Sequence, residues 1–468
     1  MHVFMMPADA WDELNPDKQA ILHLIQKHRS CVDRLKRLEN YYEGKHEILN
    51  EEGRENRLVC NHAKDITDTA SSYFIGEPVT YKSNQDINCL LDALENAGAD
   101  EADGDNGLDL SIYGRAYEYI YTEQDGTEQI IKNLPPEHTF MVYDDTIEQK
   151  ELFGVYYYVR LDDSDQRPRT YVATVLTKNY KYVLNIEEIK GPQALLEEPE
   201  AHFKGEVPII EYLNNKLAIG DFELQIPLID AYNALMSDRV TDKEQFIDSI
   251  LALYGALLSD EDMEEGDGKG GEEAMKHLKK EKLLELPADA KAEYLTRTFD
   301  ESGVEILKKA LEQDIHKFSH IPCMTDESFG GNVSGVAMEF KLLGMENITK
   351  IKTRYYKKGL RKRIRILTTC LANKGIYIDP AAITPVFSRA MPKNLLEISQ
   401  IVTNLWGKVS RKTLLAQVPF VDDVEEELKA VEEEEQEALA KQKELFGNEP
   451  NTPPGDEGTS KDVLNGKE

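Results

Sequence analysis

The sequence is poor in several residue types, and each shortage argues against a class of protein. Its 468 residues contain five cysteines, and no two of them form a CxxC pair, so a disulfide framework is disfavoured. Basic residues are also in deficit, because 55 Lys and Arg face 87 Asp and Glu and leave a net charge of −32. Proteins that bind DNA tightly and by sequence are usually basic, so that role is disfavoured as well.

Long hydrophobic runs are likewise missing. The longest apolar stretch lies near residues 247–258, where Asp248 interrupts it, and it is too short to span a bilayer. The first residues, MHVFMMPADAWDELNPDKQ, include a short apolar run without the basic segment that opens a signal peptide. We therefore expect no membrane-spanning segment and no signal peptide.

The sequence does contain enough apolar residues for a large core, since 41% of its residues are hydrophobic. A chain of this length is expected to form two to four structural units. Helical spacing is frequent up to Ala116, and from Tyr117 the pattern changes to the alternation of β-strands rich in aromatic and β-branched residues. The first 215 residues are therefore expected to form an α+β domain.

Two long helices are expected downstream, at about 227–253 and 303–318, with a small insertion between them. The insertion includes an acidic, glycine-rich stretch at 259–273, which is typical of an exposed loop. The helix at 303–318 has apolar residues at steps of three or four, so they share one narrow face. We interpret this face as a packing seam formed by Val304, Leu307, Leu311, Ile315 and Phe318.

The segment at 321–335 has the sequence IPCMTDESFGGNVSG and is unsuited to regular structure. Pro322 cannot continue a helix, and the three glycines permit backbone angles that other residues resist. A long helix at about 336–371 follows, and we expect a bend or close packing at Gly344 and Gly359 inside it. A helix, a flexible loop and a longer helix thus form one unit, which we interpret as the lining of a channel.

One block of the long helix is strongly basic. Residues 350–365 hold nine Lys or Arg residues and no acid, with two tyrosines among them. Two interpretations stay open, namely contacts to phosphate groups and pairing with acidic surfaces of a neighbouring subunit. The cations that we name for either role are Lys350, Lys357, Lys358, Arg361 and Arg365.

Patterns for catalysis or nucleotide binding are weak. The stretch GGNVSG at 330–335 lacks the Lys-Ser/Thr pair of a phosphate-binding loop and follows a helix instead of a strand. Carboxylate pairs such as Asp65 with Asp68, or Asp221 with Glu223, are expected by chance in so acidic a chain. We therefore predict no catalytic residue and no cofactor.

A metal site is also disfavoured. His316, His320 and Cys323 have the spacing of residues that share a helical face, and such a trio can bind zinc. Pro322 interrupts the helical spacing, and no second pair of ligands lies nearby in the sequence. We favour packing and loop contacts for these three residues and predict no metal.

Three segments resemble those of a known family: NRLVCNHAKDITDTASSYFIGEPVTY (Asn56–Tyr81), GDFELQIPLIDAYNALMSDRVTDKEQFIDSILALYG (Gly220–Gly255) and FGGNVSGVAMEFKLLGMENITKIK (Phe329–Lys352). In this order and spacing they are similar to the portal proteins of long-tailed, siphovirus-type bacteriophages and prophages. The likeness extends over about residues 15–445. It implies an α+β portal fold with an α/β wing, a helical stem, a small α/β clip insertion and a helical crown, assembled as a ring that is usually a dodecamer.

The resemblance also implies where these regions lie. It assigns residues 15–225, with part of 336–384, to the wing; 226–253 and 301–319 to the stem helices; 254–300 to the clip; 321–335 to a tunnel loop; 336–371 to the long helix after the loop; and 385–446 to the crown. Composition predicts a disordered tail at 447–468. The tunnel loop is expected to face DNA through Asp326, Phe329, Gly330, Asn332 and Ser334.

The implied function is that of a channel for double-stranded DNA at one vertex of a capsid, without enzymatic activity. DNA would pass through it without sequence specificity, and the clip would dock the terminase large subunit and later a head–tail connector protein. Major capsid and scaffolding proteins are further implied partners, a membrane is not, and the location is the virion after assembly in the host cytoplasm. The alternative is a capsid-associated scaffold or interaction protein without a channel.

Overall fold

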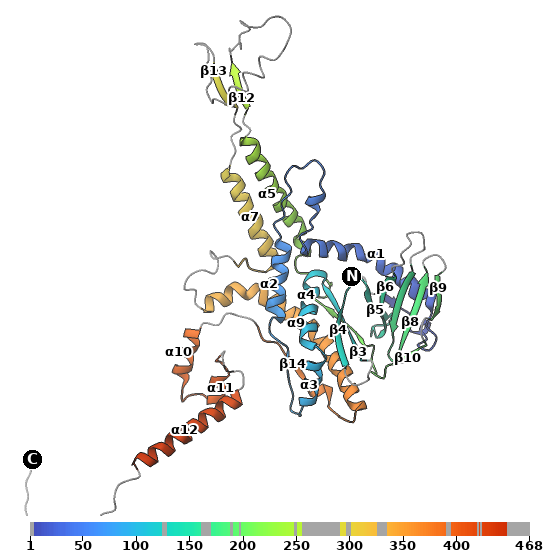
Figure 1. Cartoon of the computed structure of the whole chain (residues 1–468), viewed down its shortest axis with the longest axis vertical. Helices are drawn as coiled ribbons and strands as arrows, with labels where there is room; N and C mark the ends of the chain where they lie inside the picture. The colour runs from blue at the N-terminus through green and yellow to red at the C-terminus, as the bar shows by residue number, and fades with distance from the viewer. Residues whose placement is uncertain are drawn as a thin grey trace, which may run out of the picture. The chain divides into compact units, whose positions relative to one another are not determined.

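The structure is a computed structural model, and it describes residues 4–123, 129–160, 170–187, 191–195, 198–247, 250–254, 291–295, 301–324, 335–389, 395–418, 421 and 424–446. The chain divides into two compact units, 1–390 and 391–468, and each is described by itself (Figure 1). The described part combines helices with several sheets. The α+β class predicted from the sequence is therefore confirmed.

The first unit contains a seven-stranded sheet. Its strands are β1 (Phe4–Met6), β5 (Thr139–Asp144), β6 (Glu151–Arg160), β7 (Thr170–Leu176), β8 (Tyr180–Glu187), β9 (Gly191–Leu195) and β10 (Glu200–Ala201). They follow the order β1-β5-β6-β7-β8-β10, with β9 also paired to β8, and only the β1–β5 pair among them is parallel. Helix α1 (Lys18–Tyr42) packs on this sheet, where its Ile21 and Ile25 join Phe140 and Phe153 in one apolar core.

A second core of the first unit is built on a three-stranded sheet with the order β11-β3-β4. The strands are β3 (Arg115–Thr122), β4 (Gln129–Leu134) and β11 (Ile209–Leu213), and the helices of this core are α2 (His62–Ile75), α3 (Asn88–Asn96), α4 (Ala99–Tyr113) and α9 (Gly335–Asn373). Helix α9 contributes the buried side chains of Tyr356, Leu360 and Leu367. Helix α9, which comes late in the chain, thus completes a core to which Phe74 of α2 also belongs.

A short ribbon ties the same two parts of the chain together. Strand β2 (Thr80–Lys82) pairs antiparallel with β14 (Thr384–Val386). The next residue, Phe387, stacks on Phe74 with 5.7 Å between the ring centroids. Residues 384–389, which include the start of the segment predicted as the crown, thus belong to the first unit.

Helices α5 (Ile226–Ile247) and α7 (Glu301–Ser319) lie side by side (Figure 1). The helix predicted to continue to residue 253 ends at Ile247, which corrects the length of the first stem helix. Strand β12 (Ile250–Tyr254) instead pairs antiparallel with β13 (Lys291–Leu295). The sequence ILALY at 250–254 is a short, continuous apolar run, and periodicity alone cannot distinguish a strand from a helix there. The acidic stretch 259–273 lies outside the described residues.

Close packing occurs at one of the two glycines inside α9. A Cβ atom on Gly359 would lie 2.3 Å from Cε1 of Tyr212, so only a hydrogen lets the helix approach β11 this closely. At Gly344 the nearest atom, Cβ of His320, would be 3.6 Å away, which is an ordinary contact. The expectation of close packing therefore holds at Gly359.

The described part of the second unit is helical. It comprises α10 (Leu395–Leu405), α11 (Arg411–Leu415) and α12 (Val424–Phe446). Ser410 caps α11, since its side chain accepts a hydrogen bond from the backbone of Thr413. Arg411 then joins α11 to the acidic α12 through an ion pair of 2.8 Å with Glu435. The tail predicted at 447–468 lies outside the described residues.

Candidate functional site: the helix pair, the loop and helix α9

The predicted seam on α7 is divided between the interior and the surface. Ile315 has no exposed surface, and Val304 and Leu311 are half-buried. Leu307 and Phe318, in contrast, are 49% and 55% exposed. The seam thus packs only partly within its own chain and leaves two large apolar side chains at the surface.

Ion pairs along α5 and α7 hold the two helices in register. Arg239 of α5 lies 2.9 Å from Glu305 of α7, and Lys243 pairs with Glu301 one turn further along. All four side chains keep part of their surface in solvent, so neither pair adds much to stability. These contacts orient the helices, whereas the buried apolar residues supply most of the stabilisation.

Residues 325–334 lie outside the described part of the chain. They include all five predicted tunnel-loop residues: Asp326, Phe329, Gly330, Asn332 and Ser334. Local contacts hold the residues that directly follow α7. After Ser319, His320 has a left-handed φ of 60°, and Ile321 is fully buried. His316 Nδ1 lies 3.1 Å from the carbonyl oxygen of Ile321, which fixes the chain as it leaves the helix.

Five of the nine cations in the basic block of α9 have carboxylate partners within the chain, an outcome that neither interpretation of the sequence included. Lys352 Nζ lies 2.6 Å from Asp221 Oδ2, and both side chains are almost fully buried. The other four pairs are Lys362 with Glu151, Arg363 with Asp103 and Glu118, Arg365 with Glu206, and Lys350 with Glu346. Much of the block is therefore structural.

The named cations thus fall into two groups. Lys350 and Arg365 have partners in their own chain, and Lys357 lies 5.6 Å from the ring centroid of Phe387. Lys358 and Arg361 are exposed and have no ion-pair partner among the residues that the structure describes, and the same is true of Arg354. Which surface these three cations contact is still a matter for prediction.

Arg363 lies at the centre of a buried polar network that joins α9 to α4 and β3. Its Nε donates a hydrogen bond of 2.9 Å to Glu118 Oε1, and its Nη2 donates one of 2.6 Å to Asp103 Oδ1. The hydroxyl of Tyr356 also donates to Asp103 Oδ1, at 2.5 Å. Burial raises the pKa of Asp103, and the neighbouring Arg363 opposes this rise. The network fixes α9 against the three-stranded sheet.

The structure also shows what the sequence interpretation missed. Arg363 shares the inward face of α9 with Tyr356, Leu360 and Leu367, all of them buried. A cation at an apolar position of a helical stripe is the signal that marks a buried, paired charge. Counting nine cations in the block, without placing each on the helical wheel, obscured this signal.

The three candidate metal ligands do not converge on an ion. His316 Nδ1 is engaged with the Ile321 carbonyl oxygen, and the sulfur of Cys323 lies 3.9 Å from Glu312 Oε1. No group of three His, Cys, Asp or Glu residues within the described ranges has the arrangement of a metal site. The packing interpretation of His316 accords with its burial.

The candidate carboxylate pairs have structural partners. Asp68 accepts a hydrogen bond from the hydroxyl of Tyr42 at 3.0 Å. Asp221 accepts bonds from Ser111, Asn214 and Lys352. These bonds link helices and loops of the first unit, so they give Asp68 and Asp221 a structural role.

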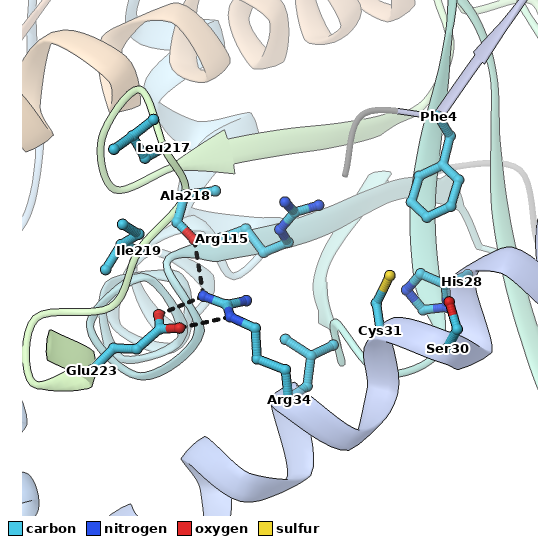
Figure 2. Close-up of a pocket in the computed structure, with 11 residues that line it drawn as sticks. Phe4, His28, Ser30, Cys31, Arg34, Arg115, Leu217, Ala218, Ile219 and Glu223 are labelled. Atoms are coloured by element: carbon cyan, nitrogen blue, oxygen red, sulfur yellow. Dashed lines mark hydrogen bonds and ion pairs between the residues drawn. The ribbon is translucent and has the colours of Figure 1, made fainter. Parts of the chain in front are cut away.

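A cavity of about 420 Å³ lies among α1, β3 and the loop that precedes α5 (Figure 2). Arg34 spans one side of it, donating 2.7 Å to Glu223 Oε1 and 3.1 Å to the carbonyl oxygen of Ala218. Figure 2 shows the guanidinium group of Arg115 directed into the space between Ala218 and Phe4. The Arg34 contacts join α1 to the loop before α5.

Two further residues of this cavity, His28 and Cys31, have the types of a nucleophile and its base. His28 Nδ1 lies 2.8 Å from the Tyr157 hydroxyl, and burial lowers the pKa of His28 to about 3. So weak a base cannot hold a proton taken from a thiol at neutral pH. His28 is therefore neutral at pH 7, with its Nδ1 engaged by the Tyr157 hydroxyl.

No helix in the described part of the chain is long and apolar enough to cross a membrane.

Two curated proteins similar to this chain are both phage portal proteins. The chain is 25% identical over 448 residues to the portal protein of Bacillus phage SPP1, covering 90% of this chain and 84% of that protein. It is 24% identical over 423 residues to the portal protein of Clostridium phage phiCD119, covering 84% and 88% respectively. Among solved structures, the neck of an empty GTA particle computed with C6 symmetry covers 76% of this chain and 90% of its own, with a TM-score of 0.46 and 11% identity.

A family model decides the assignment. The model described as "Phage portal protein, SPP1 Gp6-like" matches residues 21–441, which is most of the chain. This match includes α5, α7, α9 and the segment that links the last two. The chain therefore belongs to the SPP1 Gp6-like family of phage portal proteins.

Proposed function

We propose that this portal protein assembles into a closed ring at one vertex of a phage capsid, and that double-stranded DNA enters and leaves through the central channel. The observation that carries the proposal is the family match over residues 21–441. The exposed Leu307 and Phe318 on α7 support it, because side chains of this size at a surface fit contact with a neighbouring subunit.

The regions of the chain are proposed to divide the work. The wing comprises residues 15–225 with the part of α9 that packs against them, and the stem is the pair α5 and α7. The clip is 254–300, the tunnel loop is 321–335, and the crown is 385–446. In this arrangement the stem positions the tunnel loop, through Asp326, Phe329, Gly330, Asn332 and Ser334, beside the passing DNA.

The charge of the chain suits a conduit. A net charge of −32 per subunit repels DNA phosphates, so the duplex slides instead of adhering to the wall. No chemical step is required of the channel, and in the proposal the ATPase that drives packaging belongs to the terminase. The clip docks the terminase large subunit first and a head–tail connector protein afterwards. The ring itself sits in the virion among major capsid and scaffolding proteins.

Negative-stain electron microscopy of the purified protein tests the architecture. We expect rings, about twelve-fold, with a central hole roughly as wide as a DNA duplex. A compact closed particle without a hole would contradict the channel and favour the alternative of a capsid-associated scaffold. Because some rings assemble only with partners, a monomeric preparation is repeated with the scaffolding protein added, and the absence of rings there would also contradict the proposal.

Deletion of residues 325–332 tests the tunnel loop. The variant is expected to form normal rings but to give heads that fail to package or retain DNA, measured as nuclease-protected DNA per particle. A matched control replaces the same eight residues with a glycine–serine segment of equal length. Normal DNA-filled heads from the deletion variant would contradict the role of the loop while leaving the ring untouched.

A further inference from the structure

The outward face of α9 is a continuous surface stripe. Its members lie on one side of the helix, because the steps of three, eight, three, four and three residues between them are each close to whole helical turns. In the first half the stripe is apolar, with Phe340, Leu343 and Ile351 at 72%, 49% and 44% exposure. In the second half it is cationic, with the exposed residues Arg354, Lys358 and Arg361. We call this set the α9 stripe.

Both halves of the α9 stripe lack partners in the chain as described. Large apolar side chains that stand together at a surface usually mark a contact with another molecule. The three cations have no ion-pair partner among the described residues, although five other cations of the same helix have one. The stripe therefore requires a surface that is apolar at one end and acidic at the other.

Such a surface exists on α3 and α4 of the same chain. Residues 83–114 contain eight Asp or Glu and no Lys or Arg, the reverse of the basic block. A hollow of about 210 Å³ lies there, with an apolar floor that includes Val79, Leu91 and Leu94. Glu95 and Asp100 form its acidic rim. We call this surface the α3–α4 hollow.

The acidic groups at the α3–α4 hollow are as unpaired as the cations of the stripe. Glu95, Asp100 and Glu101 are exposed, and none has an ion-pair partner in the part of the chain that the structure describes. Leu91 is 37% exposed beside them. Each of the two surfaces thus combines exposed apolar side chains with unpaired charges, and the charges on the two surfaces are opposite in sign.

The two surfaces lie on opposite sides of one layer and cannot meet within one chain. Arg363 is on the inward face of α9, away from the stripe, and bonds to Asp103. Asp103 in turn lines the α3–α4 hollow. The hollow therefore lies on the far side of α9 from the stripe, and Arg363 lies between the two surfaces. Two different surfaces on opposite sides of a protomer are what a head-to-tail contact in a ring requires.

We propose that the α9 stripe of one copy docks on the α3–α4 hollow of the next copy, which rests on the ring proposed above. The apolar half, with Ile351 at its edge, covers the hollow, while Arg354, Lys358 and Arg361 face Glu95, Asp100 and Glu101. The contact repeats from subunit to subunit around the ring. It assigns the exposed part of the basic block to the neighbouring subunit instead of to DNA.

Charge reversal tests the pairing. Variant A carries Arg354→Glu, Lys358→Glu and Arg361→Glu, variant B carries Glu95→Lys, Asp100→Lys and Glu101→Lys, and variant AB carries all six changes. Assembly is followed by sedimentation velocity, and folding by thermal melting of the far-ultraviolet circular dichroism. We expect A and B each to raise the concentration for half-assembly at least tenfold with an unchanged melting temperature. AB, and an equimolar mixture of A and B, restore assembly because opposite charges face each other again.

Each other outcome overturns the contact in a distinguishable way. If A and B assemble like the wild type, the stripe lies outside the interface while the ring stands. If A assembles normally but loses binding to double-stranded DNA, the cations contact phosphate instead. If A and B fail and AB also fails while melting normally, the two surfaces are not partners of each other. A wild-type chain that forms no oligomer, even with the scaffolding protein added, contradicts the ring itself.

A cross-link provides a readout that does not depend on ring stability. In a Cys89→Ser background, the pair Ile351→Cys and Leu91→Cys is expected to give a ladder of covalent multimers on a denaturing gel after mild oxidation. Either cysteine alone should give no ladder beyond the background of the parent. A folded double variant that yields no multimers would contradict the proposed register.

Discussion

Arg363 of α9 and Glu118 of β3 form an ion pair in which neither side chain has any exposed surface. The guanidinium also bonds Asp103 of α4, so one cation connects three elements. Water cannot replace either partner at this depth, and a buried charge that loses its partner destabilises the fold strongly. The late helix α9 is therefore an integral part of the sheet domain.

Replacing Arg363 with methionine should destabilise the protein by about 3–5 kcal/mol, because Asp103 and Glu118 remain buried without a cation. The measurement is the free energy of unfolding of the first unit in denaturant. Arg361→Met is the matched control, since Arg361 lies on the exposed side of the same helix and should change the free energy by less than about 0.5 kcal/mol. Equal effects of the two substitutions would contradict the buried network.

Alanine at position 359 should destabilise the protein by about 1–3 kcal/mol, since its Cβ would overlap the ring of Tyr212. That ring is buried and stacked on Tyr356 at 4.4 Å, so it has little room to move. Gly344→Ala is the control, and it should leave stability unchanged or raise it by up to about 1 kcal/mol. Thermal melting compares the two, and a neutral Gly359→Ala would argue against the close approach of α9 and β11.

Asp109 should make the protein less stable as the pH rises from about 4 to 7. Burial raises the pKa of Asp109 to about 7, although Asn133 donates a hydrogen bond to it. A carboxyl with a higher pKa in the folded state binds protons preferentially there, so its stabilisation is complete below the unfolded pKa and is lost on ionisation. Asp109→Asn should therefore stabilise the protein at pH 8, by up to about 4 kcal/mol, and have little effect near pH 4.

The melting temperature of the Asp109→Asn variant between pH 4 and 8 checks this prediction. Asp100→Asn serves as the control, because Asp100 is an exposed carboxyl on the same helix and is not one of the charges that raise the pKa of Asp109. A constant difference from the wild type across this range would show that Asp109 does not titrate near neutrality.

His28 should have the opposite pH dependence. Burial lowers the pKa of His28 to about 3 in the folded chain. Below about pH 6.5 the unfolded chain therefore binds a proton at His28, whereas the folded chain does not. Stability is then lost as the pH falls below about 6.5. His28→Phe keeps the ring stacked near Phe140 but cannot be protonated. Its melting temperature should fall less steeply than that of the wild type from pH 7 to 4.5, whereas the exposed His23→Phe should follow the wild type.

Periodicity predicted the helices well because their patterns are local. The long helix expected at 336–371 is α9 at Gly335–Asn373, and the helix expected at 303–318 lies within α7 at Glu301–Ser319. Strand β1 was not predicted, since Phe4–Met6 is stabilised by pairing with residues 142–144. The same limit explains β14, whose pairing with β2 depends on contacts between distant segments.

The candidate site was predictable only in part. The stripe on α7 follows from spacing, but the division between the buried Ile315 and the exposed Phe318 depends on where α5 packs. In the basic block, the sequence identifies the cations but not the carboxylates that reach them from residues 103, 118, 151, 206 and 221. Only the folded chain brings those acids to α9.

The pairing of β2 with β14 has a consequence for how the protein is made. Thr80 and Val386, which share a hydrogen bond across this ribbon, are 306 positions apart. A ribosome has therefore translated most of the message before the second core can close around Tyr356 and Phe387. Until then the apolar surfaces of α2, α3 and α4 are exposed to solvent. We therefore expect chaperones to bind the growing chain. A truncated product that stops before α9 would be a target for proteolysis instead of a stable fragment.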